Sequence, residues 1–201
     1  MKKFELTSET KINIFGKKLF RIKALVSFGV VKTGETGGWV EKEENVNQSG
    51  DAWVFGNAEV FGNARVSGDA WVSGNARVSG DARVSGDAWV FGNARVSGDA
   101  RVSGDAWVFG NARVSGNAEV FGNARVFGNA DYTTIHGFGT QFRTTTFFRC
   151  KDKQVKVSCG CFYGTIPEFR EQVKNTRDGK IAEEYLMIAD LMEKHFAEEA
   201  K

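Results

Sequence analysis

The sequence predicts a mainly β protein whose middle part is a triangular prism of parallel strands, and three observations support this. First, four tryptophans recur at intervals of eighteen residues, each inside the unit Asp-Ala-Trp-Val: Trp53, Trp71, Trp89 and Trp107. Second, valine recurs every sixth residue from Val54 to Val126, with alanine two residues before it. A six-residue repeat nested in an eighteen-residue repeat gives three sides per coil, and it stacks the tryptophans on one side.

The third observation is that the residue three positions before each valine depends on the side. On the tryptophan side it is aspartate in the first four coils, and on the next side it is always asparagine: Asn57, Asn75, Asn93, Asn111 and Asn129. A plain six-residue repeat has no reason to sort in this way. The eighteen-residue coil is therefore the structural unit.

Each element of the repeat has a physical role in this coil. Alternate side chains of a strand point the same way, so valine and the alanine two residues earlier both face inward. Glycine followed by Asn or Asp supplies the corner, since these residues tolerate unusual backbone angles. Backbone hydrogen bonds join coils about 4.8 Å apart. The repeat from Asp51 to about Gly137 predicts nearly five coils.

The first fifty residues are expected to form a hairpin and a cap. Alternating stretches at Lys11–Phe15 and Lys18–Leu25 flank Gly16, which suits a turn. Val40 and Val46 are six residues apart but two residues out of register with the main repeat. An irregular coil is therefore expected to cover the strand edges at this end of the prism.

The C-terminal part predicts a small α+β domain. A strand pair, Thr144–Arg149 with Gln154–Ser158, is followed by a helix start at Thr165 with the capping pattern Thr-x-x-Glu. A last helix over about 180–198 carries one apolar stripe, interpreted as core: Ile181, Tyr185, Ile188, Met192 and Phe196. The expected domains are 1–50 (hairpin and cap), 51–138 (prism) and 139–201 (a β-hairpin plus two helices).

The units Val-Ser-Gly-Asp-Ala-Arg and Val-Phe-Gly-Asn-Ala-Glu resemble the hexapeptide repeat of left-handed β-helix proteins. This resemblance implies a left-handed triangular β-helix, a homotrimer, and, in well-known members, acyl transfer from coenzyme A or acyl carrier protein. The flanks, including Gly37-Gly38-Trp39-Val40-Glu41 and Cys159-Gly160-Cys161-Phe162, resemble small proteins of phages and prophages. That second resemblance implies a counter-defence or host-directed role.

The outward side chains of the tryptophan side are predicted to form an interface. The residue after each valine there is phenylalanine in four coils and Ser73 in one, so the expected interface residues are Trp53, Trp71, Trp89, Trp107, Phe55, Phe91, Phe109 and Phe127. Rings of roughly 150–250 Å² each exceed the apolar patch that a soluble monomer usually exposes. A homo-oligomer is the leading explanation; a partner surface and a stacking platform for flat ligands are the alternatives.

The other two sides display arginine and no lysine. The first arginine side carries Arg77, Arg95 and Arg113, and the second carries Arg65, Arg83 and Arg101. Like charges one coil apart repel, so each row needs acids, water or an anion nearby. The corner aspartates are expected to neutralise these rows, and the alternative is that the guanidinium groups bind phosphate at a subunit boundary.

A separate set of polar residues is the predicted ligand site. Arginine side chains, hydroxyl groups and glycine backbone are suited to bind an anion. If the C-terminal strands pair, the following residues come together: Arg143, Thr144, Thr145, Thr146, Gly160, Tyr163 and His136. His136 is a lone histidine without an orienting carboxylate, and the coils lack the long loop that carries the catalytic histidine in many β-helix acyltransferases. No catalytic residue, metal or cofactor is expected; the cysteines, Cys150, Cys159 and Cys161, lack zinc-ligand spacing.

Composition favours a soluble cytoplasmic protein, in the host cell if a phage encodes it. The formal net charge of +2 argues against nucleic acid as a partner, and neither a signal peptide nor a membrane-spanning stretch is expected. The leading interpretation is a non-catalytic binding protein that sequesters a nucleotide-like host signal or docks on a host protein. A coenzyme A-dependent acyltransferase is the alternative, and a structural assembly protein is the third.

Overall fold

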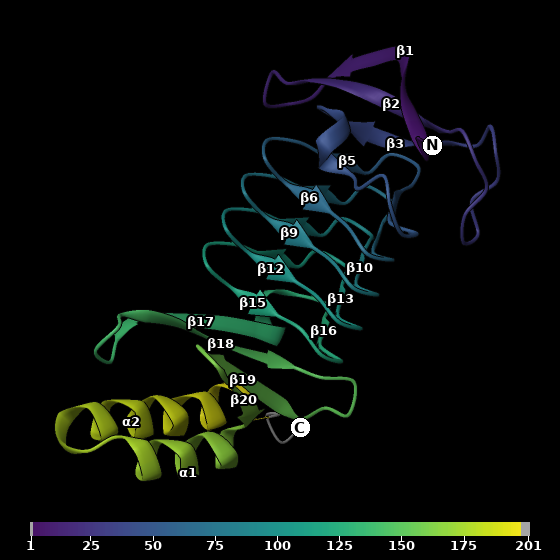
Figure 1. Cartoon of the computed structure of the whole chain (residues 1–201). Coiled ribbons are helices and arrows are strands. Elements are labelled where there is room, and N and C mark those ends of the chain that lie inside the picture. The colour runs from purple at the N-terminus through teal and green to yellow at the C-terminus, as the bar shows by residue number, and fades with distance from the viewer. Residues whose placement is uncertain (1, 198–201) are drawn as a thin grey trace.

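The protein is an elongated β-solenoid with a different cap at each end (Figure 1), and the computed structural model describes residues 2–197. At the N-terminal end lie β1 (Phe4–Ile12), β2 (Lys18–Ala24), β3 (Thr36–Val40) and the short 3-10 helix η1 (Glu43–Asn45). At the other end a four-stranded sheet carries two helices on its far face.

The solenoid strands are two residues long and form three parallel sheets, one per side. The tryptophan side consists of β4 (Trp53–Val54), β7 (Trp71–Val72), β10 (Trp89–Val90), β13 (Trp107–Val108) and β16 (Arg125–Val126). The first arginine side consists of β5 (Glu59–Val60), β8 (Arg77–Val78), β11 (Arg95–Val96) and β14 (Arg113–Val114). The second consists of β6 (Arg65–Val66), β9 (Arg83–Val84), β12 (Arg101–Val102) and β15 (Glu119–Val120).

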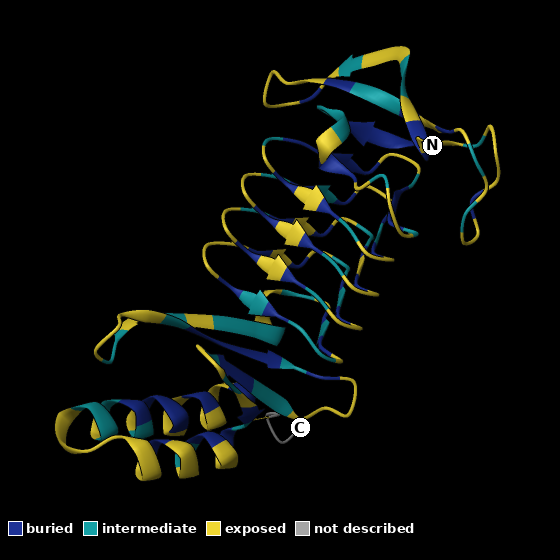
Figure 2. Ribbon diagram, in the orientation of Figure 1, coloured by how far each residue is buried: buried dark blue, intermediate teal, exposed yellow. Residues whose placement is uncertain are grey.

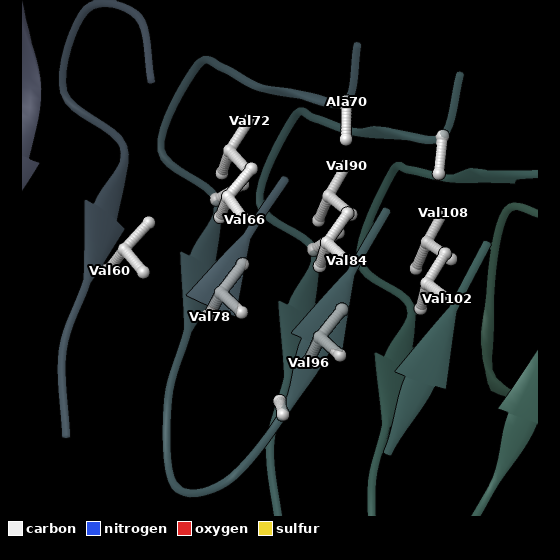
Figure 3. Packing of buried hydrophobic residues seen from close by; sticks show 14 of the residues in the cluster. Val60, Val66, Ala70, Val72, Val78, Val84, Val90, Val96, Val102 and Val108 are labelled. Atoms are coloured by element: carbon white, nitrogen blue, oxygen red, sulfur yellow. The ribbon is translucent and has the colours of Figure 1, made fainter. Parts of the chain in front are cut away.

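The predicted eighteen-residue coil is confirmed by the strand register. Trp71 pairs with Trp89, and Val90 pairs with Val108, so equivalent residues lie directly above one another. Every alanine and valine of the repeat is fully buried, and the valines form three columns that fill the solenoid (Figure 3). The outward residues of the same strands are largely exposed or half-buried (Figure 2).

Close stacking of the corners requires glycine. Gly98 has φ +68°, and a Cβ built there would lie 3.0 Å from the backbone nitrogen of Gly116, one coil further along. A left-handed backbone and the absence of a side chain are both needed at this position. The corner glycine therefore permits the close approach of successive coils at this position.

The predicted irregular first coil is confirmed at the N-terminal end. β3 pairs in parallel with β5, with Val40 opposite Val60, and Val46 bridges to Val66. Both offsets are twenty residues rather than eighteen, which is the two-residue shift seen in the sequence. β2 and β1 then continue the first arginine-side sheet in antiparallel pairing, and they cover its edge.

The expected strand Lys11–Phe15 was wrong, because the first strand ends at Ile12. The Asn13 side chain accepts hydrogen bonds from the backbone nitrogens of Phe15 and Lys17, at 2.9 and 3.0 Å, and so begins the turn two residues earlier. Phe15 consequently sits in the turn beside Gly16, whose φ is +74°.

The parallel ladder also ends earlier than expected, at Val126 rather than near residue 138. The 3-10 helix η2 (Asn129–Asp131) turns the chain, and the Asp131 carboxylate accepts from the backbone nitrogens of Phe127 and Gly128. β17 (Tyr132–Phe138) then belongs to the C-terminal sheet, next to β18 (Arg143–Arg149), β19 (Val155–Cys159) and β20 (Phe162–Thr165). The C-terminal domain therefore has four strands instead of a hairpin.

The two predicted helices are present. Thr165 caps α1 (Ile166–Thr176): its hydroxyl accepts from the Glu168 nitrogen, and the Glu168 carboxylate accepts from the Thr165 nitrogen. α2 (Gly179–Phe196) buries the predicted stripe, although Ile181 is only half-buried, and the end of the predicted helix at 198 lies outside the described residues. No described helix is both long and apolar enough to cross a membrane.

Candidate functional site

Three of the four tryptophans of the repeat form a continuous stack along one side of the solenoid. The ring centroids of Trp71 and Trp89 are 5.0 Å apart at an interplanar angle of 10°, and those of Trp89 and Trp107 are 5.1 Å apart at 3°. The parallel register imposes this spacing because one strand separation is close to the distance for ring stacking. Arg125 ends the stack, with its guanidinium 4.2 Å from the Trp107 ring centroid.

Trp53 does not belong to this exposed stack, so its assignment to the interface was wrong. Its side chain is fully buried and contacts Phe4 and Phe28 edge-on, at 5.8 and 5.3 Å between ring centroids. The reason is its position: β4 is the last strand of its sheet, and among the described residues no further strand pairs with it on that side. The N-terminal residues pack on the Trp53 ring instead, and this ring closes the end of the hydrophobic core.

The phenylalanines form a second column beside the tryptophans. Phe91 stacks on Phe109 at 5.0 Å, and Phe127, which is 61% exposed, ends the column. Ser73 interrupts it and leaves a hollow of about 350 Å³ whose walls include Phe55, Trp71, Trp89 and Phe91. The tryptophan side is therefore an apolar surface with one notch.

The arginine rows are only partly neutralised. Arg77 lies 3.4 Å from Glu59, which also pairs with Lys11 at 2.8 Å, and Arg101 lies 3.6 Å from Glu119. In the described part of the chain no ion pair joins either row to a corner aspartate. The corner aspartates, which were expected to neutralise these rows, therefore form no direct ion pair with them among the described residues. Side chains at the corners bond to the next coil instead, as Asn63 does to Asp81.

The predicted ligand residues are split between the two faces of the C-terminal sheet. Alternation along β18 directs Thr146 toward the solenoid, where its hydroxyl accepts from the Glu119 nitrogen, and Thr145 toward the helices, where its hydroxyl contacts the Cys159 sulfur. Both threonines are buried. The seven predicted residues consequently do not form a single binding site.

The remaining members of the predicted set also divide between these faces. Tyr163 packs on Phe121 at 4.5 Å on the solenoid side. Thr144 approaches the exposed His136, with 3.2 Å between its hydroxyl oxygen and Nδ1. Only Arg143 and Gly160 lie on the helix side with Thr145, and they contact each other. Within residues 2–197 no group of three His, Cys, Asp or Glu side chains is arranged to hold a metal ion.

A cavity of about 370 Å³ lies beside Arg143, between the C-terminal sheet and the two helices. Its walls include Arg143, Arg177, Gln172, Cys161, Phe162 and Phe169. Of this group, only Arg143 belonged to the ligand site predicted from the sequence. Arg177 follows the end of α1, and no motif connects it with β18, so only the fold brings the two arginines together.

Charge and burial in this cavity act on the Tyr185 hydroxyl. Burial raises its pKa, the neighbouring Cys159 raises it further, and Arg177 and Arg143 both oppose the shift. The hydroxyl donates to the Phe138 carbonyl at 3.2 Å. Both guanidinium groups therefore act on the same group in the cavity wall.

Comparison with known proteins supports the repeat assignment. Three segments, residues 58–74, 76–92 and 94–110, match the family model described as the YdcK Beta solenoid repeat. All three lie within the solenoid, so the chain carries hexapeptide-type β-solenoid repeats. No curated protein matches the chain.

Proposed function

We propose that this β-solenoid is a non-catalytic binding protein that acts as a homo-oligomer, with the tryptophan sides of its copies packed against one another. The observation that carries the proposal is the stack of Trp71, Trp89 and Trp107 beside the phenylalanine column. The resemblance of the repeats to those of left-handed β-helix proteins leads us to expect three copies in the oligomer.

The energetics favour burial of this surface. Trp89 remains 36% exposed, and Phe127 is 61% exposed, although both are large apolar side chains. Stacking already restricts the tryptophan rings, so burying them against a partner costs little further side-chain entropy. Aromatic residues of this kind dominate interfaces, at about 2 kcal/mol or more for each of a few anchors.

The edges of the tryptophan side favour a second copy of the chain in parallel orientation. One edge carries exposed corner aspartates, such as Asp87, and the opposite edge carries exposed asparagines, such as Asn93, followed by the first arginine side. A symmetry axis parallel to the solenoid places the aspartate edge of one copy beside the asparagine edge of the next. An axis across the solenoid would place aspartate against aspartate, which is repulsive.

The test is to change Trp71 and Trp89 together to serine and measure molar mass by light scattering after size exclusion. We expect the wild type to be an oligomer and the variant a monomer whose circular dichroism still reports β structure, because neither ring fills the valine core. The matched control is Arg77→Ser with Arg95→Ser, which alters the same coils on another side and should leave the oligomer intact.

Other results would contradict the proposal. A monomeric wild type, or a tryptophan double variant that keeps its oligomeric state, would show that copies of this chain do not cover the stack. A host protein, as expected for a phage or prophage product, would then be the occupant to seek.

A further inference from the structure

We propose that the cavity between the C-terminal sheet and the helices α1 and α2 binds a small organic anion, made of a phosphate or carboxylate group on a flat apolar body. The cavity of about 370 Å³ falls within the range of ligand sites, roughly 300–1,000 Å³. This proposal rests on the C-terminal domain alone and is independent of how copies of the chain assemble.

The charge of the cavity is the first argument. Arg143 and Arg177 both line it, and neither makes an ion pair within residues 2–197. No aspartate or glutamate is among the lining residues that the structure describes. Other arginines of the same domain are paired: Arg149 lies 3.5 Å from Asp131, and Arg170 lies 2.7 Å from both Asp190 and Glu193. Arg177 donates to the Thr176 carbonyl at 2.9 Å, but two guanidinium groups without a described acidic partner beside one cavity favour an anion.

Two glycines allow two side chains of the cavity wall to pack closely on the backbone. Gly160, with φ +62°, lies against the Arg143 guanidinium, and Gly139, with φ +71°, lies against the Tyr185 hydroxyl. A Cβ at either position would overlap the side chain that it faces. The absence of a side chain at Gly160 thus leaves room for the Arg143 guanidinium, which lines the cavity.

The remaining wall suits the body of the ligand. The Phe162 and Phe169 rings are 5.4 Å apart at 52°, and Phe169 meets Tyr185 edge-on at 5.8 Å. Gln172 adds an amide to the same wall. A site with charge at one part and aromatic surface at another selects a ligand with both, such as an aryl phosphate or an aryl carboxylate.

The rate at which Cys161 is alkylated can report whether the cavity is occupied by a ligand. It is exposed and lines the cavity, whereas Cys150 is buried and burial raises its pKa to about 11. Cys159 is half-buried and contacts the Thr145 hydroxyl. Alkylation near neutral pH should therefore modify Cys161 first, and an occupant of the cavity should shield it.

The experiment uses the full chain with four probes: phenyl phosphate, phenylacetate, inorganic phosphate and benzyl alcohol. Binding is measured by calorimetry, and iodoacetamide labelling of Cys161 is followed by mass spectrometry. We expect at least one of the two aryl anions to bind more tightly than inorganic phosphate or benzyl alcohol and to slow the labelling. The tighter of the two aryl anions identifies the headgroup as phosphate or carboxylate.

Variants connect the binding to the cavity. Arg143→Met and Arg177→Met should each weaken the aryl anion about tenfold or more, because each removes a charge-assisted contact. Arg95→Met, on the first arginine side, is the matched control and should bind like the wild type. The proposal is overturned if neither aryl anion binds, if benzyl alcohol binds equally well, or if both cavity variants retain wild-type affinity.

The same titration on the Trp71→Ser, Trp89→Ser double variant separates this proposal from the oligomer. We expect unchanged affinity there, whatever the mass of the particle. A loss of binding that accompanies dissociation would instead place the site at a subunit boundary and overturn the assignment to this cavity.

Discussion

The close stacking of the corners makes Gly98→Ala a quantitative test of the solenoid. Alanine at φ +68° costs about 1–2 kcal/mol because its Cβ crowds the carbonyl oxygen of its own backbone. The new Cβ would also lie 3.0 Å from the Gly116 nitrogen and 3.2 Å from the Gly116 oxygen, both of them backbone atoms that a rotamer change cannot move. Relief needs a backbone shift, and overpacking of this kind typically costs a further ~1–3 kcal/mol.

Gly116→Ala provides the matched control. This glycine occupies the same corner column, follows serine in the same way and has φ +64°, yet no atom lies within 4 Å of a Cβ built there. Its substitution should cost only the strain of alanine in a left-handed backbone conformation, about 1–2 kcal/mol of the free energy of unfolding. The entropy that alanine removes from the unfolded chain is the same for both variants and cancels in the difference.

Urea unfolding followed by far-UV circular dichroism measures both variants. We expect Gly98→Ala to lose about 1–3 kcal/mol more free energy of unfolding than Gly116→Ala. Gly56→Ala tests the opposite end of the solenoid, since φ is +59° and the nearest atom, the Gly74 oxygen, is 3.9 Å away. It should resemble Gly116→Ala. Equal losses for Gly98→Ala and the two controls would refute the close approach of neighbouring coils.

Two further predictions concern buried positions elsewhere. Burial lowers the pKa of Lys3 to about 8, so the folded state binds fewer protons than the unfolded state between about pH 8 and 10.5. The free energy of unfolding of the wild type should therefore rise across this window relative to Lys3→Met, by up to about 3 kcal/mol. Parallel curves of unfolding free energy against pH for the two proteins would contradict this. Ala94→Leu should overpack the fully buried corner and cost about 1–3 kcal/mol in urea unfolding, while Ala130→Leu, at an exposed position outside the solenoid, should cost little.

The coils were predictable because each repeats the same environment. An inward alanine or valine in the middle of the solenoid meets the same neighbours in the next coil, so the pattern specifies side, register and burial together. Trp53 shows where this reasoning fails. It stands in the same Asp-Ala-Trp-Val unit as Trp71, but among the described residues no further strand pairs with β4 at this end, and Phe4 and Phe28 cover it. Local sequence cannot distinguish the end of a stack from its middle.

The C-terminal domain shows the complementary limit. Its helices and the strand pair were predictable from capping and alternation, because those signals are local. The cavity was not, since Arg143 and Arg177 are brought together by the packing of α1 against the sheet. The grouping of Thr144, Thr145 and Thr146 with Arg143 failed for a related reason: adjacent residues of a strand point to opposite faces, and Thr146 bonds to the solenoid while Thr145 faces the helices.

The eighteen-residue coil is also a modular unit, and the number of coils sets the length of the solenoid. Adding or removing one coil would move the C-terminal domain about 4.8 Å along the axis, without changing the residues that either end must pack against. Each added coil of this kind would lengthen the row of rings by one, so chains with different copy numbers would carry tryptophan sides of unequal length. In the assembly proposed above, coil number would then determine which chains can pack along their full length.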